Sequence, residues 1–180
     1  MAENDQQRGL AGTARVPSIP ISTGALIFDY ADRLLILKPT YKSGWTIPGG
    51  IMEADGESPW QACRRELREE CGLDIACARL ACMDFRPSRK GSSGGVRFLF
   101  DCGALPDSAL DTIVLQAEEI SEYRLAPMPE ALALLRKPIR RRVRAVRKRN
   151  GAARKHALVY LEDGRPVSSV AARPAISRTR

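Results

Sequence analysis

Three glutamates in the middle of the chain, Glu66, Glu69 and Glu70, have the spacing of one helical face. At about 100° per residue they fall within an arc of roughly 100°. Carboxylates this close repel one another and destabilise an isolated helix by about a few tenths of a kcal/mol per pair. Mg²⁺ prefers oxygen ligands and needs only one or two carboxylates when substrate phosphates complete its shell. The spacing therefore indicates a divalent-cation site, with a solvated acidic face relieved by Arg65 as the alternative.

A glycine bend lies ahead of these glutamates. Pro48-Gly49-Gly50 allows a sharp turn with an exposed carbonyl, because glycine adopts conformations closed to other residues. The carbonyl oxygen of Gly50, or of a neighbour, would be a further ligand for a hard cation. Glu53 and Glu57 add negative charge near the start of the same helix. The bend and the glutamates together favour metal binding more than either feature alone.

The element that presents the glutamates is predicted to be a helix between Ser58 and Gly72. Ser58 is a suitable N-cap, Pro59 takes the first helical position and Gly72 ends the helix. An apolar stripe at helical spacing is expected to pack against the core, and it consists of Trp60, Cys63, Leu67 and Cys71.

Apolar segments and turn signals predict the other elements. Strands are expected at residues 24–29 and 33–38, joined by a hairpin turn, and at 74–86, 95–103 and 119–126. Helices are expected at 129–135 and 138–149, and a small hairpin at 157–167 that turns at Asp163-Gly164. This order predicts one domain over residues 18–150. A flexible N-terminal tail at 1–17 is expected before it, and a C-terminal extension at 151–180, the short hairpin followed by a disordered tail, after it.

Composition limits the cellular setting and the partner. The net charge of +8 indicates an anionic partner but does not distinguish a nucleotide, a nucleic acid and a membrane surface. The five cysteines form no C-x-x-C pair and are expected to be free, mostly buried thiols in a reducing compartment. No secretory signal is visible at the N-terminus, and no apolar run is long enough to span a bilayer. We therefore expect a cytoplasmic protein without a membrane partner.

The segment from Glu57 to Leu73 resembles the signature of the Nudix hydrolases, G-x5-E-x7-R-E-U-x-E-E-x-G-U, where U is aliphatic. Every fixed position after the first glycine matches, at Glu57, Arg65, Glu66, Glu69, Glu70 and Gly72. Six residues rather than five separate Gly50 from Glu57, so that an extra residue lies near Asp55. Either the loop bulges there or Ile51 takes the place of the glycine. The resemblance implies an α/β fold, the Nudix-type α/β/α sandwich around a mixed β-sheet.

The resemblance also implies roles for the charged residues. Glu69 and Glu70 would bind Mg²⁺, with Mn²⁺ as an alternative cation, and Gly50 would contribute its carbonyl. Glu66 would be a further ligand or the base that deprotonates water, and Arg65 would orient the glutamates through a salt bridge. Family members often add a glutamate from a distant loop, and Glu119 is the expected candidate, with a solvated acidic turn as the alternative.

Basic residues provide candidate contacts for an anionic substrate. Arg86, Arg89 and Lys90 lie in or beside the loop at 87–94 and are expected to bind substrate phosphate. Residues 136–155 contain eleven Lys or Arg, and Ile139, Val143 and Val146 are expected to pack one side of the helix there. No aromatic residue lies in this stretch to stack on bases, so a solvated face or weak RNA affinity is expected.

The leading function is Mg²⁺-dependent hydrolysis of the diphosphate linkage of a nucleotide derivative, such as a nucleoside triphosphate, ADP-ribose or a nucleotide sugar. A catalytically weak Nudix domain that acts as a nucleotide-binding or regulatory module is one alternative, and an RNA 5′-end pyrophosphohydrolase is another. A prenyl-diphosphate isomerase-like activity is disfavoured, because no cysteine–glutamate pair of that kind is recognisable. The expected partner is a small-molecule nucleotide diphosphate, and a homodimer stays open.

Overall fold

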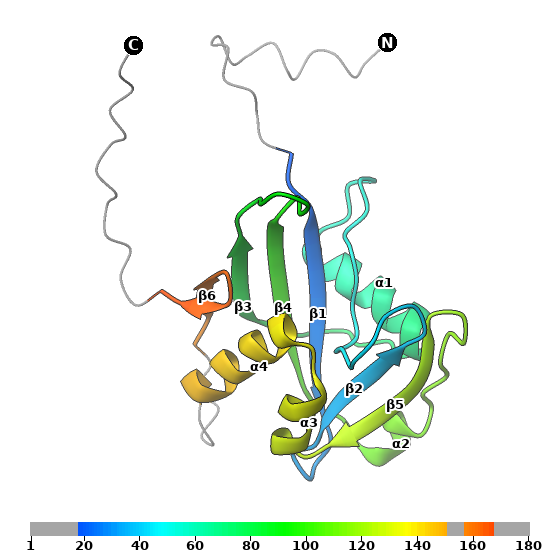
Figure 1. Cartoon of the computed structure of the whole chain (residues 1–180). Coiled ribbons are helices and arrows are strands. Elements are labelled where there is room, and N and C mark those ends of the chain that lie inside the picture. The colour runs from blue at the N-terminus through cyan, green and yellow to red at the C-terminus, as the bar shows by residue number, and fades with distance from the viewer. Residues whose placement is uncertain (1–17, 151–156, 168–180) are drawn as a thin grey trace, which may run out of the picture.

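A seven-stranded mixed sheet forms the centre of the molecule (Figure 1). The computed structural model describes residues 18–150 and 157–167. The strand order is β5-β2-β1-β4-β3-β6-β7, in which β1 pairs with β4 and β3 with β6 in parallel and the other pairs are antiparallel. The strands are β1 (Ile21–Phe28), β2 (Leu34–Pro39), β3 (Arg79–Arg86), β4 (Gly95–Ala104), β5 (Ile120–Ala126), β6 (Val159–Glu162) and β7 (Arg165–Pro166).

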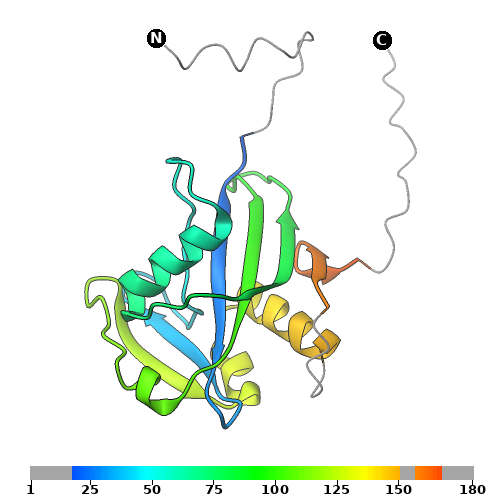
Figure 2. The same cartoon turned by 180° about the vertical axis from the view of Figure 1, so that it is seen from behind.

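Helices cover both faces of this sheet. Helices α3 (Met128–Leu134) and α4 (Lys137–Asn150) lie in front of the sheet in Figure 1, and α1 (Pro59–Cys71) lies in front of it in the reverse view of Figure 2. One apolar cluster joins α3 and α4 to the sheet, and a second joins α1 to the opposite face. The expected α/β/α sandwich around a mixed sheet is therefore confirmed.

Several expected elements appear as predicted. Ile139, Val143 and Val146 are buried on one side of α4. The hairpin at 157–167 forms as β6 and β7, and its turn places Asp163 (φ 52°) and Gly164 (φ 73°) in the left-handed region. All five cysteines are free, and three of them are buried. No helix in the described part of the chain is long and apolar enough to cross a membrane.

The strand expected at 74–86 is wrong at its start, because β3 begins at Arg79. Asp74 instead accepts ion pairs from Arg64 at 2.8 Å and Arg68 at 2.9 Å, which tie the chain back to α1. The short helix α2 (Asp107–Leu110) was not expected from the sequence. The tail at 1–17, residues 151–156 and the last thirteen residues, 168–180, lie outside the described residues.

Strands β1 and β2 pair only where the chain turns, at Phe28 and Leu34. Beyond that point the segment before α1 fills the space between them. Thr46 bonds to Leu37 of β2, while the N–H groups of Ala25 and Thr23 on β1 donate to the carbonyls of Pro48 at 2.9 Å and Gly50 at 2.8 Å. This divergence places the glycine bend within the sheet, beside α1.

Candidate functional site

Local signals at both ends fix the position of α1. The Ser58 side chain accepts from the Gln61 N–H, and the Gln61 side chain accepts from the Ser58 N–H at 2.7 Å, which is a reciprocal capping box. Pro59 begins the helix, and Gly72 ends it with a φ of 68°. Ala62, Cys63, Leu67 and Cys71 are buried against the sheet. The helix is thereby held with a fixed rotation, which decides where its glutamates point.

Glu66 and Glu70, one turn apart, face the glycine bend. Glu70 is 4% exposed and accepts the Gly49 N–H at 2.7 Å. Burial, and then the charges of Glu66 and Glu119, raise the pKa of Glu70 to about 8, although the Gly49 hydrogen bond acts in the opposite direction. Burial also raises the pKa of Glu66, and Arg65 partly offsets that effect. Both carboxyls are thus held in surroundings that disfavour their negative charge.

Gly49 must be glycine, and a side chain at Gly50 would displace Glu66. A Cβ on Gly49, whose φ is 130°, would lie 2.4 Å from the Thr23 carbonyl oxygen. A Cβ on Gly50 would lie 2.3 Å from Oε1 of Glu66. The glutamate therefore rests directly on the backbone of the bend, which is how a carboxylate and a backbone carbonyl come close together.

Arg65 gathers carboxylates from the loop and the helix. Its Nε and Nη2 donate to both oxygens of Glu57, at 3.2 and 3.1 Å. Its Nη1 donates to Glu66 at 3.0 Å and to Glu69 at 2.9 Å, and its Nη2 also donates to the Ile51 carbonyl at 3.0 Å. The hydrogen bond from Arg65 lowers the pKa of Glu57. Glu69 is turned toward Arg65, with its side chain 49% exposed.

The extra residue near Asp55 is accommodated in an exposed turn. Glu57 N–H donates to the Asp55 side chain at 3.0 Å, and Gly56 adopts a φ of 96° with open space around it. Glu57 still reaches Arg65 from the end of this turn. The loop therefore bulges between Glu53 and Glu57, and Gly49 and Gly50 keep their places against β1.

A cavity of about 560 Å³ opens where the bend, α1 and the sheet meet. Its acidic wall consists of Glu66, Glu70 and Glu119, and the charge of Glu119 acts on both helix glutamates. Residues 119 and 66 are far apart in the chain, yet the structure brings them to one cavity. The basic residues that line the cavity are Lys42, Arg86, Arg97, Arg136 and Arg142, and the charge of Lys42 also acts on Glu70.

Of the basic residues expected to meet substrate, Arg86 lines this cavity. Arg89 lines a neighbouring pocket and forms an ion pair with Asp163 at 2.9 Å, and Lys90 lines neither cavity. Arg97 and Arg142 were not singled out from the sequence. Register explains Arg97, which lies opposite Asp84 in the β3–β4 pair, whereas Arg142 reaches the site through the tertiary packing of α4.

The donor set at the acidic wall is made entirely of oxygen, the element that Mg²⁺ prefers. Glu66 and Glu70 are desolvated and near other negative charges, so a bound cation would relieve the repulsion. Within residues 18–150 and 157–167, no group of three or more Asp, Glu, His or Cys side chains is arranged to hold a metal ion by itself. The residues therefore fit a cation that shares its shell with backbone, water and substrate oxygens.

Residues 19–146 match the sequence model of the NUDIX domain. The chain has no match among the curated proteins. Its structure is similar to that of a MutT protein from Methanosarcina mazei Go1, at 23% identity over 77% of this chain and 99% of that one, with a TM-score of 0.62.

Two further solved structures are similar to it. The NUDIX domain of Shewanella oneidensis NrtR, complexed with ADP ribose, is 19% identical over 84% of this chain and 100% of that one, with a TM-score of 0.64. The E. coli dihydroneopterin triphosphate pyrophosphohydrolase is 21% identical over 74% of this chain and 97% of that one, with a TM-score of 0.55. Since the NUDIX match covers most of the chain, including the helix with its glutamates, this chain belongs to the Nudix hydrolase family.

Proposed function

We propose that the chain hydrolyses the diphosphate linkage of a nucleotide derivative with the help of Mg²⁺. One observation carries this proposal: Glu66, Glu70 and Glu119 form one wall of a cavity whose other charged side chains are basic. Acidic side chains suit a cation, and basic side chains suit phosphate groups. The names of the similar proteins, which include a complex with ADP ribose and a UDP-X diphosphatase, agree with a nucleotide derivative as substrate.

Mg²⁺ would be held by Glu66, Glu69, Glu70 and Glu119 together with a backbone carbonyl of the bend. The Gly50 carbonyl already accepts the Thr23 N–H, so it would use its second lone pair, or the adjacent Gly49 carbonyl would serve instead. When bound, the cation neutralises the diphosphate and lowers the pKa of a nearby water.

Two side chains have further roles in the proposed reaction: Glu66 and Arg65. As the alternative to binding the cation, Glu66, whose pKa is raised by burial, would take a proton from the attacking water. Arg65 acts as a positioning residue, because it holds Glu57, Glu66 and Glu69 at once. Arg136 also lines the cavity, and its buried Nε has no hydrogen-bond partner within the described chain.

The test is a screen of nucleotide diphosphate compounds with Mg²⁺, followed by chromatography of the products. Glu70→Gln and Glu66→Gln should lower kcat by two or more orders of magnitude, roughly the loss expected for a general base or an electrostatic group. Glu118→Gln is the matched control, because this exposed glutamate lies beside Glu119 without lining the cavity. Full activity in both the Glu70→Gln and the Glu66→Gln variant would refute this mechanism.

The same screen distinguishes the proposed hydrolysis from the two alternative functions. Tight binding of one compound without turnover would favour a nucleotide-binding or regulatory module. Release of diphosphate from 5′-triphosphorylated RNA, without turnover of small nucleotides, would favour an RNA 5′-end pyrophosphohydrolase. Turnover of a small nucleotide derivative is the result that we expect.

A further inference from the structure

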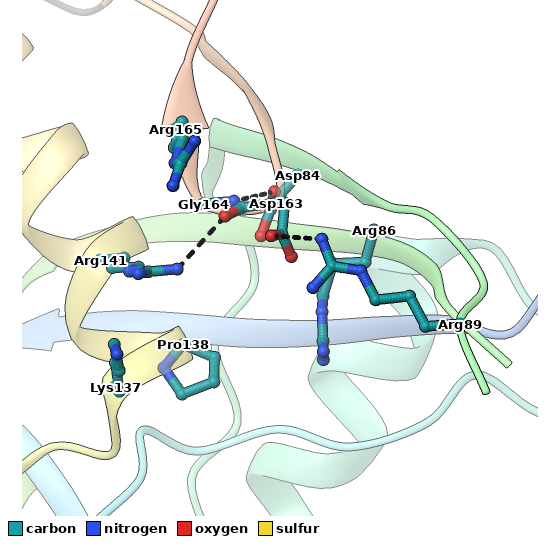
Figure 3. Close-up of a pocket in the computed structure, with 9 residues that line it drawn as sticks. All are labelled: Asp84, Arg86, Arg89, Lys137, Pro138, Arg141, Asp163, Gly164 and Arg165. Atoms are coloured by element: carbon teal, nitrogen blue, oxygen red, sulfur yellow. Dashed lines mark hydrogen bonds and ion pairs between the residues drawn. The ribbon is translucent and has the colours of Figure 1, made fainter. Parts of the chain in front are cut away.

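A second cavity, of about 470 Å³, lies between the end of β3, the start of α4 and the turn of the β6–β7 hairpin (Figure 3). Its volume falls in the range of small-molecule sites. Five of its nine lining residues are basic: Arg86, Arg89, Lys137, Arg141 and Arg165. In Figure 3, Arg89 and Arg141 approach the Asp163–Gly164 turn from opposite sides. We call this cavity the basic pocket.

The two acidic residues of the basic pocket are already paired. Asp84 is 1% exposed, bonds to the buried Arg142 at 2.7 Å, and accepts the Gly164 N–H at 2.9 Å. Asp163 forms its ion pair with Arg89 at 2.9 Å. Asp84 therefore anchors the hairpin turn to the sheet and to α4, and neither carboxylate is left to balance the other basic residues.

The other four basic residues make no salt bridge with any described residue: Arg86, Lys137, Arg141 and Arg165. Arg141 makes only a long hydrogen bond, 3.5 Å, to the Asp163 carbonyl. They come from three separate elements, β3, α4 and β7, and meet around one hollow. A solvated basic face would follow one side of a helix, whereas this arrangement encloses a space from several directions.

The basic pocket adjoins the candidate active cavity. Arg86 and Pro138 line both of them, so Arg86 stands at their boundary. A ligand in the larger cavity that extends past Arg86 would therefore reach Lys137 and Arg141. Guanidinium groups suit phosphate because they donate paired N–H bonds to its oxygens.

We propose that the basic pocket binds a phosphate group that is separate from the diphosphate at the glutamates. Two sources share this chemistry: a second phosphate carried by the nucleotide in the larger cavity, or a free phosphate or pyrophosphate ion. Binding in the pocket stands without the proposed hydrolysis, and only the first source rests on the proposed function.

The test uses the full chain and two double variants with equal loss of charge. Lys137→Gln with Arg165→Gln removes one lysine and one arginine from the pocket, and both side chains are exposed and without ion pairs. Arg144→Gln with Lys148→Gln is the control, because it removes the same charge from the exposed side of α4 outside the pocket. The amide signal of Gly164, which lies in the hairpin turn, is the local reporter in NMR titrations.

Inorganic pyrophosphate, added without divalent cations at low ionic strength, is the first probe. The Gly164 signal should shift and saturate in the wild-type protein. The pocket variant should bind at least about tenfold more weakly, which corresponds to the loss of about one charge-assisted hydrogen bond. The control variant should stay within about twofold of wild type. Repeating the titration at higher salt should weaken binding, since exposed charges are screened.

ADP-ribose and ADP-ribose 2′-phosphate, which differ by one phosphate, distinguish the sources. If the nucleotide supplies the phosphate, the 2′-phosphorylated compound alone should shift Gly164, and the pocket variant should weaken its binding but not that of ADP-ribose. If a free ion supplies it, ADP-ribose 2′-phosphate should leave the Gly164 signal unshifted, and pyrophosphate should still shift that signal when this nucleotide is present. These readouts do not require turnover, so a failure of the hydrolase proposal would not be mistaken for a failure of the pocket.

Two results would overturn the proposal. One is a Gly164 signal that does not respond to pyrophosphate or to either nucleotide. The other is an equal loss of binding in the pocket and control variants, which would mean that the whole basic surface attracts anions. If the basic surface instead binds single-stranded RNA, RNA binding should weaken equally in the pocket variant and in the control variant.

Discussion

The buried carboxyl of Glu70 makes the stability of the metal-free protein depend on pH. Burial raises its pKa from 4.5 to about 8, so the folded state keeps the Glu70 proton at pH values where the unfolded state has released it. The folded protein then binds more protons than the unfolded chain, and stability falls as pH rises between about 4.5 and 8. A shift of this size corresponds to at most roughly 5 kcal/mol, at about 1.4 kcal/mol per pKa unit.

The perturbation that isolates this effect is Glu70→Gln. Glutamine does not titrate, and its amide oxygen still accepts the Gly49 N–H. In the presence of a chelator, the variant should match wild type near pH 5 and exceed it by a few kcal/mol near pH 8. Part of the decline should remain, because burial also raises the pKa of Glu66. Glu118→Gln is the control, since this exposed side chain does not line the cavity and its loss should leave the decline intact.

The assay is urea unfolding followed by circular dichroism at several pH values, with the free energy of unfolding extrapolated to water. Adding Mg²⁺ near pH 8 should stabilise the wild type much more than the Glu70→Gln variant, because a ligand that binds only the folded state raises its stability. Parallel pH curves for wild type and Glu70→Gln would refute the assignment of the decline to Glu70.

Three further predictions concern single contacts. Arg65→Lys should lower kcat by about tenfold to a hundredfold with little loss of stability, because an ammonium cannot hold Glu57 with two parallel bonds; steady-state kinetics checks this. Gly50→Ala should weaken Mg²⁺ binding in a calorimetric titration, since the added Cβ would displace Glu66. Asp84→Asn should destabilise the fold by about 3–5 kcal/mol in urea unfolding, because the buried Arg142 would lose its partner.

The features that could be predicted from the sequence are those set by neighbouring residues. Ser58, Pro59 and Gly72 fix the ends of α1, and the helical repeat fixes which glutamates share a turn, so this element required no tertiary information. The repeat could not show that the carboxylates differ. Glu70 is buried against the glycine bend whereas Glu69 turns to Arg65, because the distinction depends on what packs above the helix.

Features set by the topology were harder to predict. Arg97 and Arg142 reach the site through strand pairing and through the path of α4 across the sheet. The surroundings of Arg89 likewise depend on the C-terminal hairpin, because Arg89 forms an ion pair with Asp163 and lines the basic pocket instead of the larger cavity. Glu119 was predicted through the resemblance, since nothing in its own neighbourhood marks it as different from Glu118.

The β6–β7 hairpin also determines how the sheet ends. β6 covers β3, and the two-residue β7 that follows contains Pro166, which has no N–H to offer another strand. Without the hairpin, the longer β3 would be left as an open edge with unpaired backbone groups and with Phe85, which is already 38% exposed. The short C-terminal hairpin is therefore a guard against edge-to-edge aggregation, and loss of residues after 157 would reduce solubility before it altered chemistry at the glutamates.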